Sequence, residues 1–142
     1  MRTVEIEALH DLRTATNDVL EGYREMSERA EPEIQSVIQR LTGMHERHAL
    51  ELDAELLRLR DASLDDSSFQ GTVNKVVVIL RDWVSDIGHD VLPAVRQGED
   101  SLRNQYKKSL GSLQGSGQTS VVELLTTQCE SIGAEILRLP NS

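Results

Sequence analysis

The feature that most constrains the fold is an apolar spacing of three and four residues, sustained over long stretches. Such spacing places side chains on one face of an α-helix. Pro32 interrupts it, because proline disfavours the helical state at Glu31 and is tolerated in the first turn of a new helix. A second stripe runs from Ile34 to Leu59, and the short link predicts two antiparallel helices. The first stripe consists of Leu9, Leu12, Thr16, Val19, Tyr23, Met26 and Ala30.

The remainder of the chain predicts three further helices. Residues 61–71, "DASLDDSSFQG", are polar and predict a loop. Residues 72–88 contain a valine-rich run that is compatible with a buried strand as well as with a helix. No other segment offers a partner strand, so we expect an extra helix bearing Trp83. Stripes over residues 90–113 and 120–139 follow, separated by a glycine- and serine-rich turn.

Together these elements predict an all-α protein. Two long hairpins are joined by a connection of about 25 residues, which is long enough to cross a bundle from one end to the other. One such crossover is typical of the ferritin-like four-helix bundle. We therefore expect two antiparallel helical hairpins, with the extra helix in the crossover, in a single domain over residues 1–142.

Charge and hydropathy exclude several partners. The net charge of -9 disfavours binding to nucleic acid, and we interpret the short basic group of Arg103, Lys107 and Lys108 as a solvated helix face. No run approaches the roughly 20 apolar residues of a membrane span, and the start lacks a signal-peptide pattern. We expect a cytoplasmic protein without nucleic-acid or membrane partners. Its single cysteine, Cys129, excludes an intramolecular disulfide.

Polar residues on the helix faces predict a layer at mid-bundle. The stretch "LTGMHERHALEL" places His45 and His48 three residues apart, and at 100° per residue both lie on the inward stripe. The same argument turns Glu99 and Cys129 inward, each near the middle of its helix. Gln128 falls on the rim, and Glu21 faces solvent.

Three interpretations of the two histidines stay open. They can be packed residues hydrogen-bonded to Glu99, Thr16 or Gln128, since a buried polar group is costly unless it is paired. In that case we expect His48 to be the donor to Glu99. They can form a site with Glu99 and Cys129 for a single zinc, iron or manganese ion. Alternatively, His45 can be exposed and without a role.

Catalytic and cofactor sites of known types are not indicated. A di-iron site needs a Glu from two helices and Glu-x-x-His from each of the other two, and His45 stands where a Glu is required. No glycine-rich phosphate loop follows a strand, and we interpret Cys129 as a small core residue rather than a nucleophile. We predict no catalytic residue and no bound cofactor.

Self-association is the function that the pattern favours. The run "VVVIL" at residues 76–80 is apolar on more than one helical face, because Val77 lies about 100° from Val76. A homodimer that uses the crossover helix would bury the excess. We therefore expect a non-catalytic bundle acting through self-association or protein contacts, with a metal-binding bundle as the alternative.

Two segments also carry a resemblance to a known family. "LHDLRTATNDVLEGYREMSERA" and "VRQGEDSLRNQYKKSL" resemble the bacterial ferritin-like four-helix bundles classed as domain of unknown function 2383. The resemblance covers nearly the whole chain and rests on a Gly-Tyr and a Gly-Glu-Asp turn. The family pattern has two acidic residues before Gly-Tyr, whereas this chain has Leu20 at the first of these two positions and Glu21 at the second. The resemblance implies the fold and a stress or storage setting, and it assigns no activity.

Overall fold

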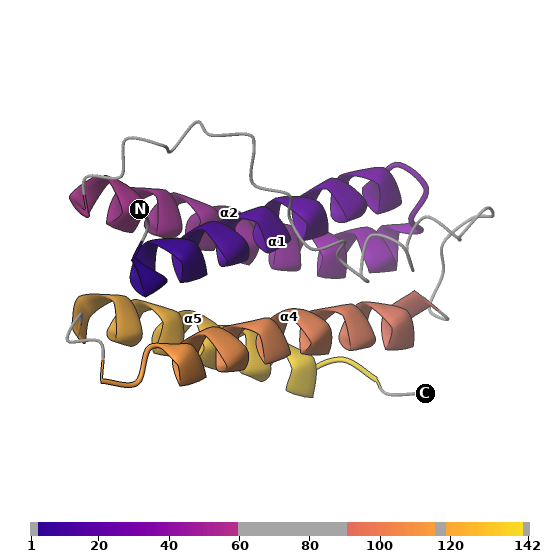
Figure 1. The fold of residues 1–142 in the computed structure, drawn as a ribbon. Helices are drawn as coiled ribbons and strands as arrows, with labels where there is room; N and C mark the ends of the chain where they lie inside the picture. The colour runs from indigo at the N-terminus through magenta and orange to yellow at the C-terminus, as the bar shows by residue number, and fades with distance from the viewer. Residues whose placement is uncertain (1–2, 60–90, 116–118, 141–142) are drawn as a thin grey trace.

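The computed structural model describes residues 3–59, 91–115 and 119–140, and these contain four α-helices and no strand. Figure 1 shows two layers, with α1 and α2 above α4 and α5. The prediction of an all-α bundle is confirmed, whereas the predicted extra helix bearing Trp83 lies outside the described residues. The helices are α1 (Val4–Ser27), α2 (Pro32–Arg58), α4 (Leu92–Ser112) and α5 (Thr119–Leu137).

The first two helices begin where local chemistry favours a helix start. Thr3 caps α1, because its hydroxyl accepts a hydrogen bond from the Ile6 amide over 3.3 Å. Glu5 and Glu7 place negative charge in the first turn, where it complements the helix dipole. At α2, Glu31 is extended and Pro32 opens the helix, as its fixed φ angle favours.

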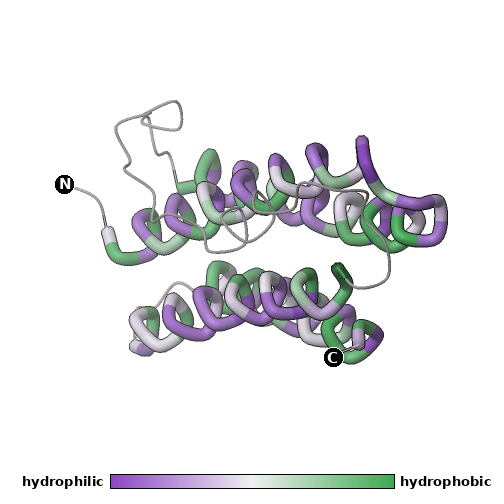
Figure 2. The backbone as a smooth tube through the Cα atoms, turned by 90° about the vertical axis from the view of Figure 1, so that its right-hand side faces the viewer, coloured by the Kyte–Doolittle hydropathy of each residue, from purple (hydrophilic) through white to green (hydrophobic). Residues whose placement is uncertain are grey.

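One hydrophobic cluster draws buried residues from all four helices. Leu9 of α1, Leu41 of α2, Val95 of α4 and Leu125 of α5 are fully buried in it. Figure 2 shows hydrophobic and hydrophilic positions alternating along each helix, as expected when one face packs and the other meets water. Burial of these faces is the main force that holds the two layers together.

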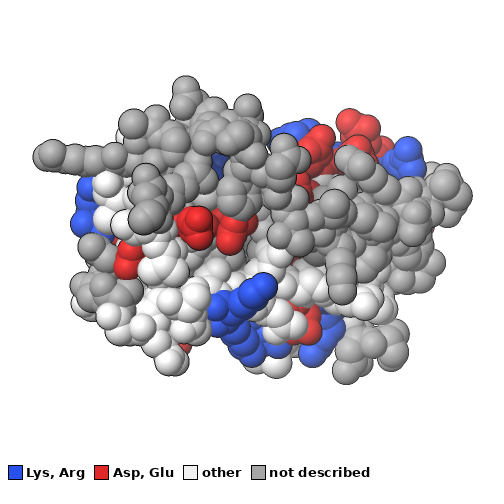
Figure 3. All heavy atoms as spheres, in the orientation of Figure 1, with Lys and Arg blue, Asp and Glu red and all other residues white. Residues whose placement is uncertain are grey.

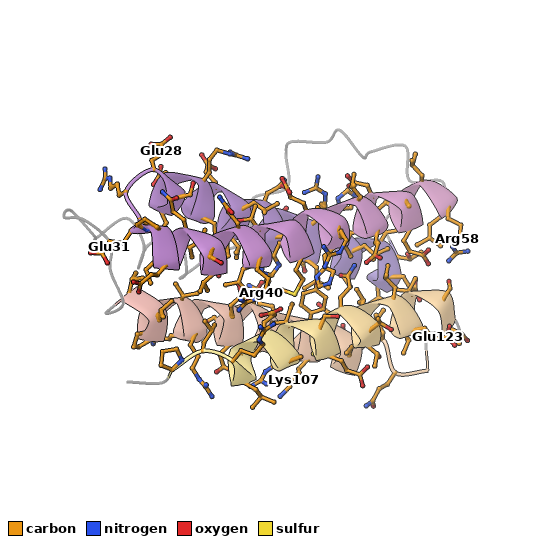
Figure 4. All side chains as sticks on the ribbon, turned by 180° about the vertical axis from the view of Figure 1, so that it is seen from behind. Glu28, Glu31, Arg40, Arg58, Lys107 and Glu123 are labelled. Carbon is orange, nitrogen blue, oxygen red and sulfur yellow. The ribbon has the colours of Figure 1, made fainter. Side chains whose placement is uncertain are left out.

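Ion pairs join neighbouring helices at the edges of this core. Arg13 of α1 donates to Asp53 of α2 over 2.7 Å. Arg40 of α2 donates to Glu135 of α5 over 2.9 Å, and Figure 4 shows Arg40 between the two layers. The pairs are partly exposed, so we expect a modest contribution to stability from each.

The buried face of α5 differs from the predicted one at its centre. Gln128 is buried and Cys129 is only half-buried, whereas the sequence pattern turned Cys129 inward and left Gln128 on the rim. Two helical turns separate Leu125 from Ile132. The residue that lies between them on the core face can therefore be at position 128 or at position 129. Hydrogen bonds to neighbouring helices hold Gln128 there, which apolar spacing does not reveal.

Candidate functional site

A buried carboxylate, that of Glu99 on α4, is the centre of the polar layer. His45 of α2 places Nε2 2.8 Å from Oε2 and 3.0 Å from Oε1 of Glu99. The Tyr23 hydroxyl of α1 donates a second hydrogen bond to Oε2. Neither the His45 nor the Glu99 side chain is exposed to solvent. The two donors therefore replace the water that this carboxylate would otherwise bind.

Tyr23 is the member of this cluster that the sequence placed on the core stripe of the first helix but not in the polar layer. Its ring lies on the core face of α1, with its centroid 6.1 Å from that of His45. Burial, together with the charge and hydrogen bond of Glu99, holds the Tyr23 pKa well above its usual range. A tyrosine on a helix seam needs a partner for its hydroxyl, and that requirement is the sequence signal that could have identified it.

His48 lies beside this cluster, one turn along α2. Its ring centroid is 6.0 Å from that of His45, and the two rings are nearly perpendicular. Within the described part of the chain, the buried Nδ1 atoms of both histidines have no hydrogen-bond partner. Burial, reinforced by the neighbouring His45, lowers the pKa of His48 to about 4. His48 is therefore neutral at physiological pH.

A second buried network is built around Gln128 of α5. Tyr106 of α4 donates to Oε1 of Gln128 over 2.6 Å. The Gln128 amide nitrogen donates to the backbone oxygen of His48 over 3.2 Å and to Glu51 over 2.9 Å. Burial also raises the pKa of Tyr106 above its usual range. The Gln128 amide thus accepts the hydrogen bond of Tyr106, as the Glu99 carboxylate accepts that of Tyr23.

The structure corrects two expectations about the histidines. We expected His48 to be the donor to Glu99, but the contact is made by His45, since His48 lies at the level of Gln128. The interpretation of His45 as an exposed residue is wrong, because its side chain is fully buried. Thr16 is also buried, and its hydroxyl donates to the Leu12 backbone oxygen over 2.7 Å rather than to a histidine.

Cys129 is half-buried against the hydrophobic core and takes part in none of the hydrogen bonds described above. Burial raises its thiol pKa, while Lys107 and Arg103 act in the opposite direction. Among the residues with described positions, no three His, Cys, Asp or Glu side chains form a metal-binding group. The predicted site of His45, His48, Glu99 and Cys129 is thus brought together only in part, and metal binding by these residues stays a prediction.

The outer surface carries both charged and apolar groups. Figure 3 shows Lys and Arg side chains gathered over the lower layer on one face. Lys107 and Lys108 of α4 are exposed, as the sequence predicted, and Arg103 donates to Asp100 over 2.5 Å. On α2, two leucines instead face solvent: Leu50 is 70% exposed and Leu57 is 63% exposed.

Comparison with known families gives one match. Residues 4–112 match the family described as "Domain of unknown function (DUF2383)". The chain belongs to this family. The matched span of this DUF2383 protein includes Tyr23, His45 and Glu99, and it ends before Gln128 and Cys129. No curated protein and no solved structure matches the chain, and none of the described helices has the length and apolar character to cross a membrane.

Proposed function

We propose that this DUF2383 protein is a non-catalytic, ferritin-like four-helix bundle that acts by associating with a second copy of itself. The helix arrangement supports the ferritin-like part of this proposal. α1 packs mainly against α2, and α4 packs mainly against α5. In Figure 1, α2 ends at one end of the bundle and α4 begins at the other. Two antiparallel hairpins joined by a long crossover would have this arrangement.

The observation that carries self-association is an apolar stripe on the outer face of α2. Leu50, Ala54 and Leu57 are all exposed, and spacings of four and three place them on one side of the helix. They lie opposite the buried face that contains Leu52 and Leu56. Exposed leucines repeated along one helix face are typical of a contact surface, whereas scattered single ones are not.

The charges beside this stripe favour a second copy as its partner. Glu46, Arg47, Glu51 and Arg58 are exposed, so two acidic and two basic residues flank the three apolar ones. A chain with a net charge of -9 repels its own copies over most of its surface. Arg58 already pairs with Glu55 over 2.7 Å. Arg47 and Glu46 remain as opposite charges beside the stripe that can pair with their counterparts across a two-fold axis.

Light scattering coupled to gel filtration tests the proposal. At micromolar concentration we expect twice the chain mass of 15.9 kDa. A Leu50→Glu, Leu57→Glu double variant should elute as a monomer, because four carboxylates would meet at the interface. Leu137→Glu is the matched control, since Leu137 is exposed at the end of α5 and should leave the dimer intact. A wild-type protein that is purely monomeric would exclude self-association.

A metal-binding bundle is the second candidate function. The contact between His45 and Glu99 favours it, because imidazole and carboxylate are common ligands of transition metals. This candidate does not depend on self-association, since the cluster is formed within one chain.

A further inference from the structure

We propose that two copies of the chain pack their α2 helices antiparallel, with Leu57 of each copy lying in a hollow at Gly43 of the other. The two-fold axis then passes close to Leu50. This inference rests on the self-association proposed above, and it adds the orientation of the two copies and the residue that receives each leucine. Seven residues lead from Gly43 to Leu50 and seven from Leu50 to Leu57, so all three lie on one face of α2.

Gly43 is not explained by packing within one chain. It lies inside α2 and its φ angle is not positive, so the backbone does not require glycine there. Outside its own turn of helix, an added Cβ would meet only Nη1 of Arg47, at 3.8 Å, which is an ordinary contact. Glycine inside a helix is less stable than alanine. A close approach by a second molecule accounts for a glycine at this position.

The surface on both sides of Gly43 is hollow. Two grooves adjoin there, because Gln39 and Gly43 line both of them. One has a volume of about 330 Å³ and lies between α1 and α2, with Leu20 in its wall. The other has a volume of about 450 Å³ and lies between α2 and α5, with Ala134 in its wall. A leucine placed above Gly43 therefore finds open space and apolar side chains on either side.

Two-fold symmetry matches Leu57 to this hollow. In an antiparallel pair with its axis at Leu50, the residue seven positions after Leu50 lies opposite the residue seven positions before it in the other copy. Leu57, which is 63% exposed in one chain, then lies over Gly43. The two Leu50 side chains meet at the axis. A parallel pair would set leucine against leucine and leave both hollows empty, which loses packing contacts.

The charges beside the stripe favour this axis. Two-fold symmetry brings the same flank of both antiparallel helices together, and Arg47 and Glu51 are exposed on one flank. They lie three residues before and one residue after the axis, so Arg47 is within about 3 Å of the level of the partner's Glu51. On the other flank, Glu46 lies near the partner's Asp53, whose carboxylate is already paired with Arg13.

An axis between Glu46 and Arg47 is less favourable. It would place Leu50 over Gly43, but it would also bring the two Arg47 side chains next to each other, and like charges side by side are unfavourable. Leu57 would then lie level with the exposed Ser36 rather than over a hollow.

Cysteine cross-linking of the full chain tests the orientation. Cys129→Ser removes the native thiol, and Gly43→Cys and Leu57→Cys are introduced into separate chains. The two variants are mixed while reduced and then oxidised with copper phenanthroline. We expect a covalent dimer on a non-reducing gel from the mixture and none from either variant alone, since a disulfide needs Cα atoms within about 7 Å. A covalent dimer from Leu57→Cys alone would overturn the antiparallel pairing.

Filling the hollow is an independent test. Gly43→Leu should raise the dimer dissociation constant at least about tenfold, measured by light scattering over a dilution series, because the partner's Leu57 would clash. Circular dichroism should be unchanged, since the space is open within one chain. Gly111→Leu is the matched control, because Gly111 of α4 also has nothing within 4 Å of an added Cβ. Equal effects of the two substitutions would contradict the role given to Gly43.

The two proposals fail in different ways. A wild-type chain that is monomeric in light scattering would overturn the proposed self-association and this inference with it. A wild-type dimer that gives no cross-link between positions 43 and 57 would overturn this inference alone, because the copies would then associate in another arrangement.

Discussion

Nε2 of His45 lies 2.8 Å from Oε2 of Glu99, and neither side chain reaches solvent. The contact joins α2 of one layer to α4 of the other. Removing both groups from water costs several kcal/mol, and their attraction compensates this cost only with good geometry and further hydrogen bonds. Tyr23 supplies such a bond. The pair thus favours one alignment of the two layers over alternatives that would leave a carboxylate buried without partners.

Replacement of Glu99 should therefore be costly. In Glu99→Ala, His45 and the Tyr23 hydroxyl both lose a buried partner, and we expect a loss of roughly 2 to 5 kcal/mol in the free energy of unfolding. Glu21→Ala is the control, since Glu21 is exposed, and it should change stability by less than about 0.5 kcal/mol. Denaturant unfolding measures both, and equal losses would contradict the role assigned to Glu99.

His48 should make stability depend on pH. Its folded-state pKa of about 4 lies below its ordinary value of 6.5, so the unfolded chain binds more protons between these pH values. The stability that neutral His48 contributes is complete above about pH 6.5 and is lost as the pH falls towards 4. Unfolding experiments at pH 7 and pH 5 should show a larger loss for wild type than for His48→Gln. Identical losses would show that His48 is not the group responsible.

Much of the helical framework could be predicted from sequence because it depends on local signals. Apolar spacing identified the core faces of α1, α2 and α4, and Pro32 marked the start of α2. Both signals act within one or two turns of the chain, so they are readable without knowing what packs opposite. The inward orientation of His45, His48 and Glu99 followed from helix geometry in the same way.

The pairing within the polar layer could not be predicted by the same means. Helical angle gives the direction of a side chain, but it does not give the position of one helix relative to another along the bundle axis. That offset decides whether Glu99 meets His45 or His48, which are separated by about 4.5 Å along the axis. The placement of Gln128 failed for a related reason, since its burial depends on partners from α2 and α4.

Arg96 of α4 should stabilise the end of α5. Its Nη1 donates to the backbone oxygens of Ile136 over 2.9 Å and Leu139 over 2.6 Å. The last carbonyls of a helix lack the amide partner found four residues along in the helix interior, and a cation there also complements the helix dipole. The Ile136 oxygen accepts one further bond, from the Leu139 amide over 3.0 Å. Arg96→Ala should cost about 1 to 3 kcal/mol in denaturant unfolding. Arg138→Ala should cost less than about 0.5 kcal/mol, because Arg138 is largely exposed and 3.8 Å from Glu135.

The neighbouring residues Gln128 and Cys129 provide the sharpest test of the α5 core face. Gln128→Ala removes the acceptor of the buried Tyr106 hydroxyl and the donor to the His48 backbone oxygen, so it should destabilise the fold by about 1 to 3 kcal/mol. Cys129→Ala removes one half-buried sulfur and should cost less than about 1 kcal/mol. If α5 instead turned Cys129 inward, the order of the two losses would reverse. Thermal and denaturant unfolding of both variants, with circular dichroism to verify helicity, distinguishes the two orientations.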